Sequence, residues 1–526
     1  MKHISLFFSC IIICMANSFA QQRYIDEVFT QVQDTTNIVY GQNISVLTGA
    51  PELIDLTMDV YEPAGDTASA RPLIVYMHPG DFLPILFNGG TNGSRNDSAV
   101  VEMCRQFAKR GYVVANIDYR LGWNPIANDP DSGQAMRTGG LLQAVYRGLQ
   151  DAKTCVRFFR MNAATQGNTY KIDVNKIVVG GQGSAGYIAT SYATLNKPSE
   201  LQTLLKFISP STVVNYGFVA GYPYINQAYM GDFDGLNGIP QFNNPNWAGY
   251  SSDINMVFNL EGDLGDSSWM EAGEVPLVSF HDVNNPLSPY TNGPVFVPLP
   301  NGTILYVVWV TGSHDFIRIS NQLGNQTFAA CPYTDPYSIR ANQVNEGWEG
   351  LFPFVQPDPN DTLPGDPFHG QTGPWEWWDC AALHALGAAY GFTSGYVDTA
   401  CYNSMLTNPL MSKTKALAYI DTVQGYLCPR IACSLFTVGI DEVNQLKEDV
   451  SMFPNPSAQL VHLQLQDPAA KIFSLSIYDV EGRKVFSEEN MNQNHAEISC
   501  DQFGKGLFTI QIQTEKGIAV GKLVIE

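Results

Sequence analysis

The sequence predicts an α/β protein with a doubly wound, mostly parallel sheet, followed by a small all-β domain. Short apolar runs typical of buried strands alternate along the first part with helical segments, and the order strand, helix, strand is clear between residues 72 and 117. From Val450 the pattern changes to short alternating strands separated by turns. These observations predict one large mixed domain and one small β-sandwich.

Composition limits the possible functions. The chain has 526 residues, of which 45% are hydrophobic and 15% charged, enough to bury a large core and too apolar for a disordered chain. Its formal net charge is −21, because 50 acidic residues outnumber 29 Lys and Arg residues. A protein without a general basic field is not expected to bind nucleic acid or anionic membranes.

The first twenty residues have the pattern of a secretory signal peptide. A basic start is followed by an apolar run at Leu6–Met15, and Ser18–Ala20 places small residues where a signal peptidase reads. We expect cleavage before Gln21 and no transmembrane segment, because no other stretch approaches ~18 uninterrupted apolar residues. Eight of the ten cysteines remain in the mature chain, and an oxidising compartment would permit disulfides whose pairing the spacing does not give.

A charged connector at 439–449 divides the mature chain into domains at 21–438 and 450–526. The smaller domain has six predicted strands, which favour a sandwich: Leu460–Leu465, Phe473–Tyr478, Lys484–Phe486, Ala496–Ser499, Leu507–Gln513 and Ala519–Ile525.

The larger domain has strands predicted at 72–77, 111–117 and 176–180, and helices at 98–110, 141–161 and 188–195. Asp97 is the expected N-cap of the first of these helices. A segment rich in Gly, Asn, Tyr and Trp interrupts this rhythm, and we expect a lid-like insertion near 215–270.

The tail resembles a known family. The motifs FPNP at 453–456, YDVEGRKV at 478–485, GLF at 506–508 and KLVI at 522–525 follow one another in order. Together they resemble the type A sorting domain of the type IX secretion system. The resemblance implies contact with that machinery and export across an outer membrane to the cell surface or the medium.

The candidate nucleophile lies in the turn GGQGSAGY at 180–187, between a strand and a helix. This turn resembles the nucleophile elbow of α/β-hydrolase-fold serine esterases, which holds a serine in a strained turn above a helix N-terminus. The resemblance predicts Ser184 as the nucleophile. Gln182 stands where the GxSxG pattern has glycine.

The segment MHPGDF at 77–82 resembles the HGGGF motif of the same esterases. The resemblance implies that the backbone amides of Gly80, Asp81 and Ala185 hold the oxyanion of an ester-hydrolysis intermediate. The segments NIDYRLG at 116–122 and AVYRGLQD at 144–151 resemble this superfamily too.

The acid and the base follow later in the chain. The segment 276–290 resembles the acid strand and loop of these enzymes and places Asn285 at the acid position, with Asp282 as the alternative. The base must come after residue 285, and we favour His369, in a loop that follows the predicted last strand, over His314.

The sequence therefore predicts a secreted serine hydrolase that cleaves a small-molecule or polymeric carboxylic ester through an acyl-enzyme on Ser184, without a cofactor or a metal. The alternative comes from another class. Because Asp81, Gln182 and Asn285 all depart from the esterase pattern, the protein could instead be a catalytically degenerate hydrolase-fold surface or binding protein.

Overall fold

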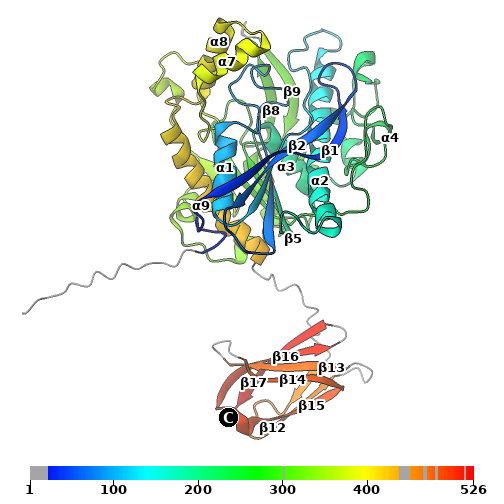
Figure 1. Cartoon of the computed structure of the whole chain (residues 1–526), viewed down its shortest axis with the longest axis vertical. Helices are drawn as coiled ribbons and strands as arrows, with labels where there is room; N and C mark the ends of the chain where they lie inside the picture. Colours follow the sequence, from blue (N-terminus) through cyan, green and yellow to red (C-terminus); the bar gives the residue numbers. More distant parts are fainter. Residues whose placement is uncertain (1–21, 300–302, 437–449, 466–470, 480–483, 515–516) are drawn as a thin grey trace, which may run out of the picture. The chain divides into compact units, whose positions relative to one another are not determined.

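The computed structural model describes residues 22–299, 303–436, 450–465, 471–479, 484–514 and 517–526. The chain divides into two compact units at residues 1–435 and 436–526, and each is described by itself (Figure 1). The predicted signal peptide and the 439–449 connector lie outside the described residues. In the described part of the chain, no helix has both the length and the hydropathy to cross a membrane.

The larger unit is built on an eight-stranded sheet with the spatial order β1-β2-β4-β3-β5-β6-β7-β10. Strands β1 and β2 pair antiparallel and β2 is antiparallel to β4, whereas every pair from β4 to β10 is parallel. This order and these directions define the α/β-hydrolase fold and confirm the predicted fold class. The strands are β1 Val32–Ser45, β2 Glu52–Pro63, β3 Arg71–Met77, β4 Val113–Ile117, β5 Ile172–Gln182, β6 Met256–Leu260, β7 Leu277–Asp282 and β10 Leu351–Phe354.

Helices cover both faces of the sheet (Figure 1). Strand β3 shows why: Leu73 and Val75 enter one apolar cluster with residues of α2 and α3, whereas Ile74 and Tyr76 enter the other with residues of α1 and α9. Side chains of a strand alternate between faces, so a strand buried on both sides is apolar throughout. The helices are α1 Ser98–Lys109, α2 Gly133–Thr165, α3 Ser184–Thr194, α4 Gln227–Met230, α5 Ser313–Gln322, α6 Pro336–Ala341, α7 Cys380–Tyr390, α8 Ser394–Thr407 and α9 Lys413–Phe436.

Two local predictions can be compared with the structure. Asp97 is the N-cap residue of α1 as predicted, but its carboxylate accepts hydrogen bonds from the amides of Gly93 and Ser94 and none from the helix. The predicted lid range 215–270 runs over β6, which is a fully buried strand of the main sheet. A five-residue strand is short, and the Gly- and Asn-rich sequence around it concealed it.

Between α3 and β6 the chain forms short 3₁₀ turns at Pro198–Leu201, Leu205–Phe207 and Val214–Tyr216, followed by α4. A separate antiparallel hairpin, β8 Gly293–Pro298 with β9 Ile304–Val310, follows β7. Both segments are additions to the eight-stranded core.

The smaller unit contains two antiparallel sheets, β11-β12-β15 and β14-β13-β16-β17. Side chains from both sheets, among them Val461, Leu463, Ile477 and Ile510, share one apolar core. The predicted sandwich and its six predicted strands are confirmed, and β11 is an additional strand. The strands are β11 Val450–Phe453, β12 Leu460–Leu465, β13 Ile472–Tyr478, β14 Lys484–Gln493, β15 His495–Ser499, β16 Gly506–Thr514 and β17 Gly517–Ile525.

Two disulfides, Cys331–Cys433 and Cys380–Cys401, tie elements of the larger unit together. The second joins the start of α7, at Cys380, to the middle of α8, at Cys401. The other four described cysteines, Cys104, Cys155, Cys428 and Cys500, are buried thiols.

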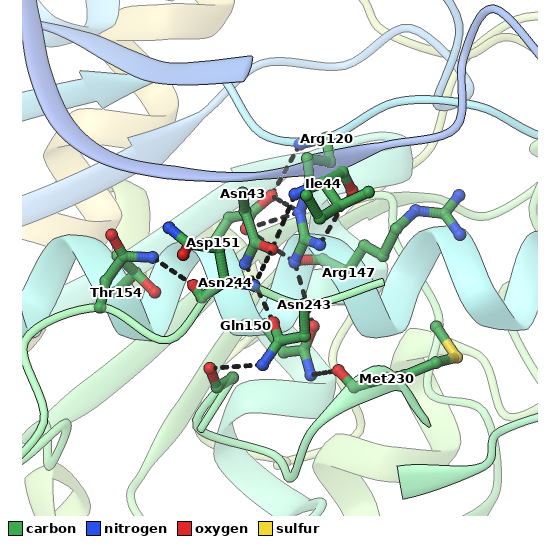
Figure 2. Close-up of polar contacts among 12 residues, drawn as sticks. Asn43, Ile44, Arg120, Arg147, Gln150, Asp151, Thr154, Met230, Asn243 and Asn244 are labelled. Carbon is green, nitrogen blue, oxygen red and sulfur yellow. Dashed lines mark hydrogen bonds and ion pairs between the residues drawn. The ribbon is translucent and has the colours of Figure 1, made fainter. Parts of the chain in front are cut away.

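A fully buried ion pair joins three segments of the larger unit (Figure 2). Arg120, just after β4, donates its side-chain Nε and its backbone N–H to the carboxylate of Asp151 in α2, at 2.8 to 2.9 Å. Its remaining guanidinium nitrogens donate to the carbonyls of Ile44 in β1 and Arg147 and to the Gln150 amide oxygen. All of these partners are protein groups. They replace the water that would otherwise hydrate the guanidinium, and they therefore offset the cost of burying its charge.

The Gln150 side chain extends the network to the segment between α3 and β6. Its Nε2 donates to the carbonyls of Met230 and Asp232, each at 2.8 Å. Asn43 in β1 accepts from the amide of Asn244 and donates to the side chain of Asn243 (Figure 2). The insertion is therefore held to the core by polar contacts.

We expect Asp151→Asn to lower the free energy of unfolding of the larger unit by about 3 to 5 kcal/mol, because Arg120 would keep a buried charge without its counterion. Denaturant unfolding followed by tryptophan fluorescence measures this unit alone, since all eight tryptophans lie between residues 123 and 378. Glu271→Gln, which removes an exposed ion pair with Lys197, should leave the midpoint unchanged. Equal midpoints for wild type and Asp151→Asn would contradict the role assigned to the pair.

Candidate active site

The predicted site residues come from loops that leave the carboxyl ends of parallel strands. The loop after β3 carries Gly80 and Asp81, the turn after β5 carries Ser184, and the segments after β7 and β10 carry Asn285 and His369. Carboxyl ends of neighbouring parallel strands meet at one edge of a sheet, where α/β proteins bind their ligands. The fold therefore brings the right loops to one edge.

The turn after β5 has its apex at Gly183. This residue has φ 54° and ψ −123°, and α3 begins directly after it at Ser184. A Cβ built on Gly181 would lie 2.3 Å from the carbonyl oxygen of Ala185, so Gly181 and Ala185 are the two closely packed small positions of the turn. The prediction that Ser184 stands at the strained apex is wrong, because the pattern is shifted by one residue and glycine occupies the apex.

The one-residue shift of the pattern also explains Gln182. If Ser184 is aligned with the serine of GxSxG, Gln182 stands at a glycine position. With Gly183 at the apex, that glycine position is Gly181. Gln182 is the last residue of β5 and lies between the small position and the apex. Its side chain is buried, accepts a hydrogen bond from the Tyr76 hydroxyl at 2.7 Å and donates to Glu376 at 3.0 Å. It is a structural polar residue below the turn.

The Ser184 hydroxyl is buried at the start of α3, where the residue is 5% exposed. Its Oγ accepts a hydrogen bond from the backbone N–H of Asp81 at 3.0 Å, and the Tyr119 hydroxyl lies 3.4 Å away. The Asp81 amide, predicted to donate to an oxyanion, is thus paired with the serine itself. Ala185 is the second residue of α3, one position beyond the residue that follows the apex.

Pro79 lies over the apex. A Cβ built on Gly183 would be 3.1 Å from the Cβ of Pro79, closer than ordinary van der Waals contact. The loop after β3 is itself tightly placed, because a Cβ on Gly80 would lie 2.3 Å from the Cα of Gly93. The side chain of a nucleophile at position 183 would therefore meet Pro79.

The Asn285 side chain organises its own loop. Its Oδ1 accepts from the amides of Leu287 and Ser288 at 2.8 and 3.0 Å, and its Nδ2 donates to the Thr372 hydroxyl at 3.0 Å. Thr372 belongs to the segment after β10. The residue at the predicted acid position thus contacts a threonine of that segment.

Asp282, the alternative acid, ends β7 and is 1% exposed. Within the described residues its carboxylate oxygens accept no hydrogen bond. Burial, with Glu261 beside it, raises the pKa of Asp282 well above its ordinary value. A raised pKa favours the neutral acid, a state that cannot stabilise an imidazolium.

Sequence reasoning missed Glu261, which follows β6 with φ 60°. Its carboxylate accepts from the Thr372 hydroxyl at 2.6 Å and from the amides of Gly373 and Asp282 at 2.8 and 3.3 Å. An acidic residue directly after a strand could have indicated a site residue here. This segment was instead predicted to belong to a lid-like insertion. Glu261 ties the segment after β10 to the centre of the sheet.

Neither predicted base hydrogen-bonds to Ser184. The His369 side chain is 80% exposed and its Nδ1 lies 2.9 Å from Asp358. His314, in the first turn of α5, contacts Asp315 and Glu346 at 3.2 and 3.3 Å. Among the residues that the structure describes, no imidazole is hydrogen-bonded to the Ser184 hydroxyl.

His78 is a further buried histidine near the turn. Its ring stacks on Tyr119 with centroids 4.7 Å apart, and its Nδ1 lies 2.6 Å from the Pro79 carbonyl. Burial lowers the pKa of His78 to about 4, so the ring is neutral at neutral pH and Nδ1 is the donor. Its contacts fix the β3 loop against Tyr119.

Comparison with known proteins places the tail. Residues 451–526 match the family model described as secretion system C-terminal sorting domain, and this part of the chain is such a domain. The protein is therefore exported to the cell surface or the medium. No curated protein matches the chain.

Among solved structures, the chain is similar to esterase 2 of Thermogutta terrifontis phosphorylated by paraoxon, with 19% identity over 51% of this chain and 77% of that one and a TM-score of 0.29. It is also similar to the same esterase with butyrate bound, at 17% identity over 45% and 70% of the two chains and a TM-score of 0.27. The fold of the larger unit is assigned from its strand order and strand directions.

The glycine positions of the turn can be tested by substitution. We expect Gly181→Ala to destabilise the larger unit most, because its Cβ would meet backbone, and Gly183→Ala to cost about 1 to 3 kcal/mol for a strained alanine. Gly395→Ala in α8, where a Cβ meets nothing within 4 Å, is the matched control. Tryptophan-monitored unfolding that shows no loss for Gly183→Ala would contradict the placement of the apex.

A buried carboxyl beside the site gives a pH prediction. Asp263 is fully buried, its Oδ2 accepts from the Tyr187 and Ser288 hydroxyls at 2.7 Å, and burial raises its pKa to about 8. The folded protein keeps this proton whereas the unfolded chain loses it above pH ~4, so stability falls as pH rises through this window, by at most about 1.4 kcal/mol per pH unit. His78, with its lowered pKa, opposes this trend only below pH ~6.5.

Between pH 6.5 and 8 the unfolding midpoint of the wild type should therefore fall, and Asp263→Asn should flatten part of that slope. Thermal unfolding in a buffer series measures both. Asp131→Asn, at an exposed carboxyl before α2, serves as the control. A variant slope equal to that of the wild type would show that Asp263 is already ionised in the folded protein.

Proposed function

We propose that the larger unit is an exported hydrolase-fold binding protein that does not cleave esters through Ser184. The observation that carries the proposal is glycine at the apex of the turn after β5, with Pro79 against the space that a side chain there would need. In a serine esterase of this fold the nucleophile stands at that strained apex. A glycine cannot attack a carbonyl carbon.

The environment of Ser184 supports the same conclusion. A serine hydroxyl is a weak nucleophile until a base removes its proton, and such a base must lie within hydrogen-bond reach. The partners of Ser184 are the Asp81 amide, which donates to it, and the Tyr119 hydroxyl. Burial raises the pKa of Tyr119 above its ordinary value, so this phenol is not a base at neutral pH.

The charge arrangement at the edge of the sheet also differs from that of an esterase. A triad needs an ionised acid that orients and stabilises an imidazolium. Here Asn285 is neutral, and the Thr372 hydroxyl joins it to Glu261. Burial also raises the pKa of Glu376 well above its ordinary value, which favours the neutral acid.

One observation favours the second candidate, ester hydrolysis through Ser184. Its hydroxyl lies at the N-terminus of α3 and within hydrogen-bond distance of a backbone amide, an environment that stabilises negative charge on oxygen. If the loop after β10 moved a histidine such as His369 toward this hydroxyl, Ser184 could attack an ester. The experiment must therefore be able to detect that activity.

The two candidates are separated by treating the mature protein with a fluorophosphonate probe and by assaying p-nitrophenyl acetate and butyrate. We expect no covalent labelling and no turnover above that of buffer, with an active serine esterase as positive control. Ser184→Ala should behave as the wild type does. Labelling and turnover that both disappear in Ser184→Ala would refute the proposal.

Ser394→Ala is a necessary second control. The Ser394 hydroxyl lies 3.4 Å from His384 Nδ1, and His384 Nε2 lies 2.9 Å from Asp398 on the exposed side of α7 and α8. Labelling that persists in Ser184→Ala but is lost in Ser394→Ala would identify this exposed serine as the reactive group. The control thus assigns any labelling to one serine.

A further inference from the structure

The β8–β9 hairpin has one buried and one exposed face, and both are apolar. Val295, Val297 and Val308 pack against the main core, as does the fully buried Val307 at the bulge. The opposite face is formed by six residues, here called the aromatic face: Pro294, Phe296, Pro298, Ile304, Tyr306 and Trp309. None of the six carries a charge.

The register places these side chains next to one another. Phe296 pairs with Tyr306, Pro294 with Trp309 and Pro298 with Ile304, and residues two apart on β8 share a side. The Phe296 and Tyr306 rings have centroids 6.1 Å apart and are inclined at 71°. The aromatic face is therefore a continuous surface across both strands.

The exposed fractions are high for such side chains: 43% for Phe296, 65% for Ile304, 37% for Tyr306 and 50% for Trp309. The solvent side of an antiparallel hairpin is ordinarily polar, which gives strands their alternating pattern. A contiguous exposed apolar surface marks an interaction site or an aggregation risk. In an exported protein, a surface of this kind indicates a partner.

Beside the aromatic face lies a cavity of about 160 Å³. Tyr306 lines it together with Leu205, which is 88% exposed. Gln134, Thr138 and Lys206 also line it, but their polar groups are hydrogen-bonded within the protein, to the carbonyls of Val307 and Trp309 among others. The polar groups of the aromatic face itself are the Tyr306 hydroxyl and the Trp309 indole N–H, on side chains that are both exposed. This combination suits a ligand that has both apolar and hydroxylated surfaces.

Charge distinguishes between possible partners. The chain carries a formal net charge of −21, so an anionic lipid surface or an acidic polymer would be repelled. The uncharged aromatic face fits an uncharged partner. Sugar rings present C–H faces that stack on aromatic rings and hydroxyls that hydrogen-bond to polar side chains.

We propose that the aromatic face and the adjoining cavity bind a neutral polysaccharide outside the cell. The rings of Phe296, Tyr306 and Trp309 form the stacking surface, and the Tyr306 hydroxyl and Trp309 indole N–H meet the hydroxyls of a bound sugar. This binding does not depend on whether Ser184 is reactive. The hairpin pairs with no strand of the main sheet among the described residues, and it carries none of the predicted catalytic groups.

The test is affinity electrophoresis of the mature protein, tail included, in gels that contain hydroxyethyl cellulose, arabinoxylan, galactomannan or soluble starch. We expect retardation by at least one of them, and a rise in Kd of roughly tenfold for Trp309→Ala and for Phe296→Ala. Tyr402→Ala removes a ring that is 57% exposed on α8 and should leave retardation unchanged. Thermal unfolding checks that each variant is folded.

Three results would overturn the proposal: no retardation by any of the four polysaccharides, retardation that Trp309→Ala and Phe296→Ala leave unchanged, or equal weakening by Tyr402→Ala. Light scattering and flotation with phosphatidylcholine vesicles complete the experiment. Self-association or vesicle binding lost in Trp309→Ala, without polysaccharide binding, would assign the aromatic face to a second copy of the chain or to a lipid surface.

Discussion

The larger unit depends on the buried pairing of Arg120 with Asp151. A guanidinium removed from water is stable only when its donors have hydrogen-bond partners, and here the partners come from two secondary-structure elements, α2 and β1. The pair fixes the chain directly after β4, and Tyr119, one residue earlier, reaches the His78 carbonyl and the neighbourhood of Ser184. A contact deep in the core thus sets the position of the groups at the edge of the sheet.

Much of the fold could be predicted because its signals are local. An apolar strand, a helical repeat and a second strand define each unit of the parallel sheet, and the tail has alternating strands with motifs in a fixed order. The missed strand β6 is the exception. Its five residues are buried on both faces, so the run is too short to give a period, and its neighbours are typical of loops.

The sequence was sufficient to place the candidate site at the turn after β5, but not to predict which residues contact one another there. The turn after β5 was found from its glycines and serine, yet only the backbone torsions and the contact of Gly181 with Ala185 show that the apex is Gly183 and not Ser184. Glu261 and Thr372 are 111 residues apart and belong to no motif. Their pairing is created by the arrangement of β6 and β10, which no local pattern contains.

The departures from the esterase pattern are consistent with one another. Without a side chain at position 183, Pro79 can lie against the turn, and a proline is acceptable there because its missing amide is not needed to hold an oxyanion. The Asp81 amide still needs an acceptor, and the Ser184 hydroxyl supplies one. Asn285 caps its own loop and donates to Thr372. Each of these groups has a structural partner, which agrees with the proposed binding function.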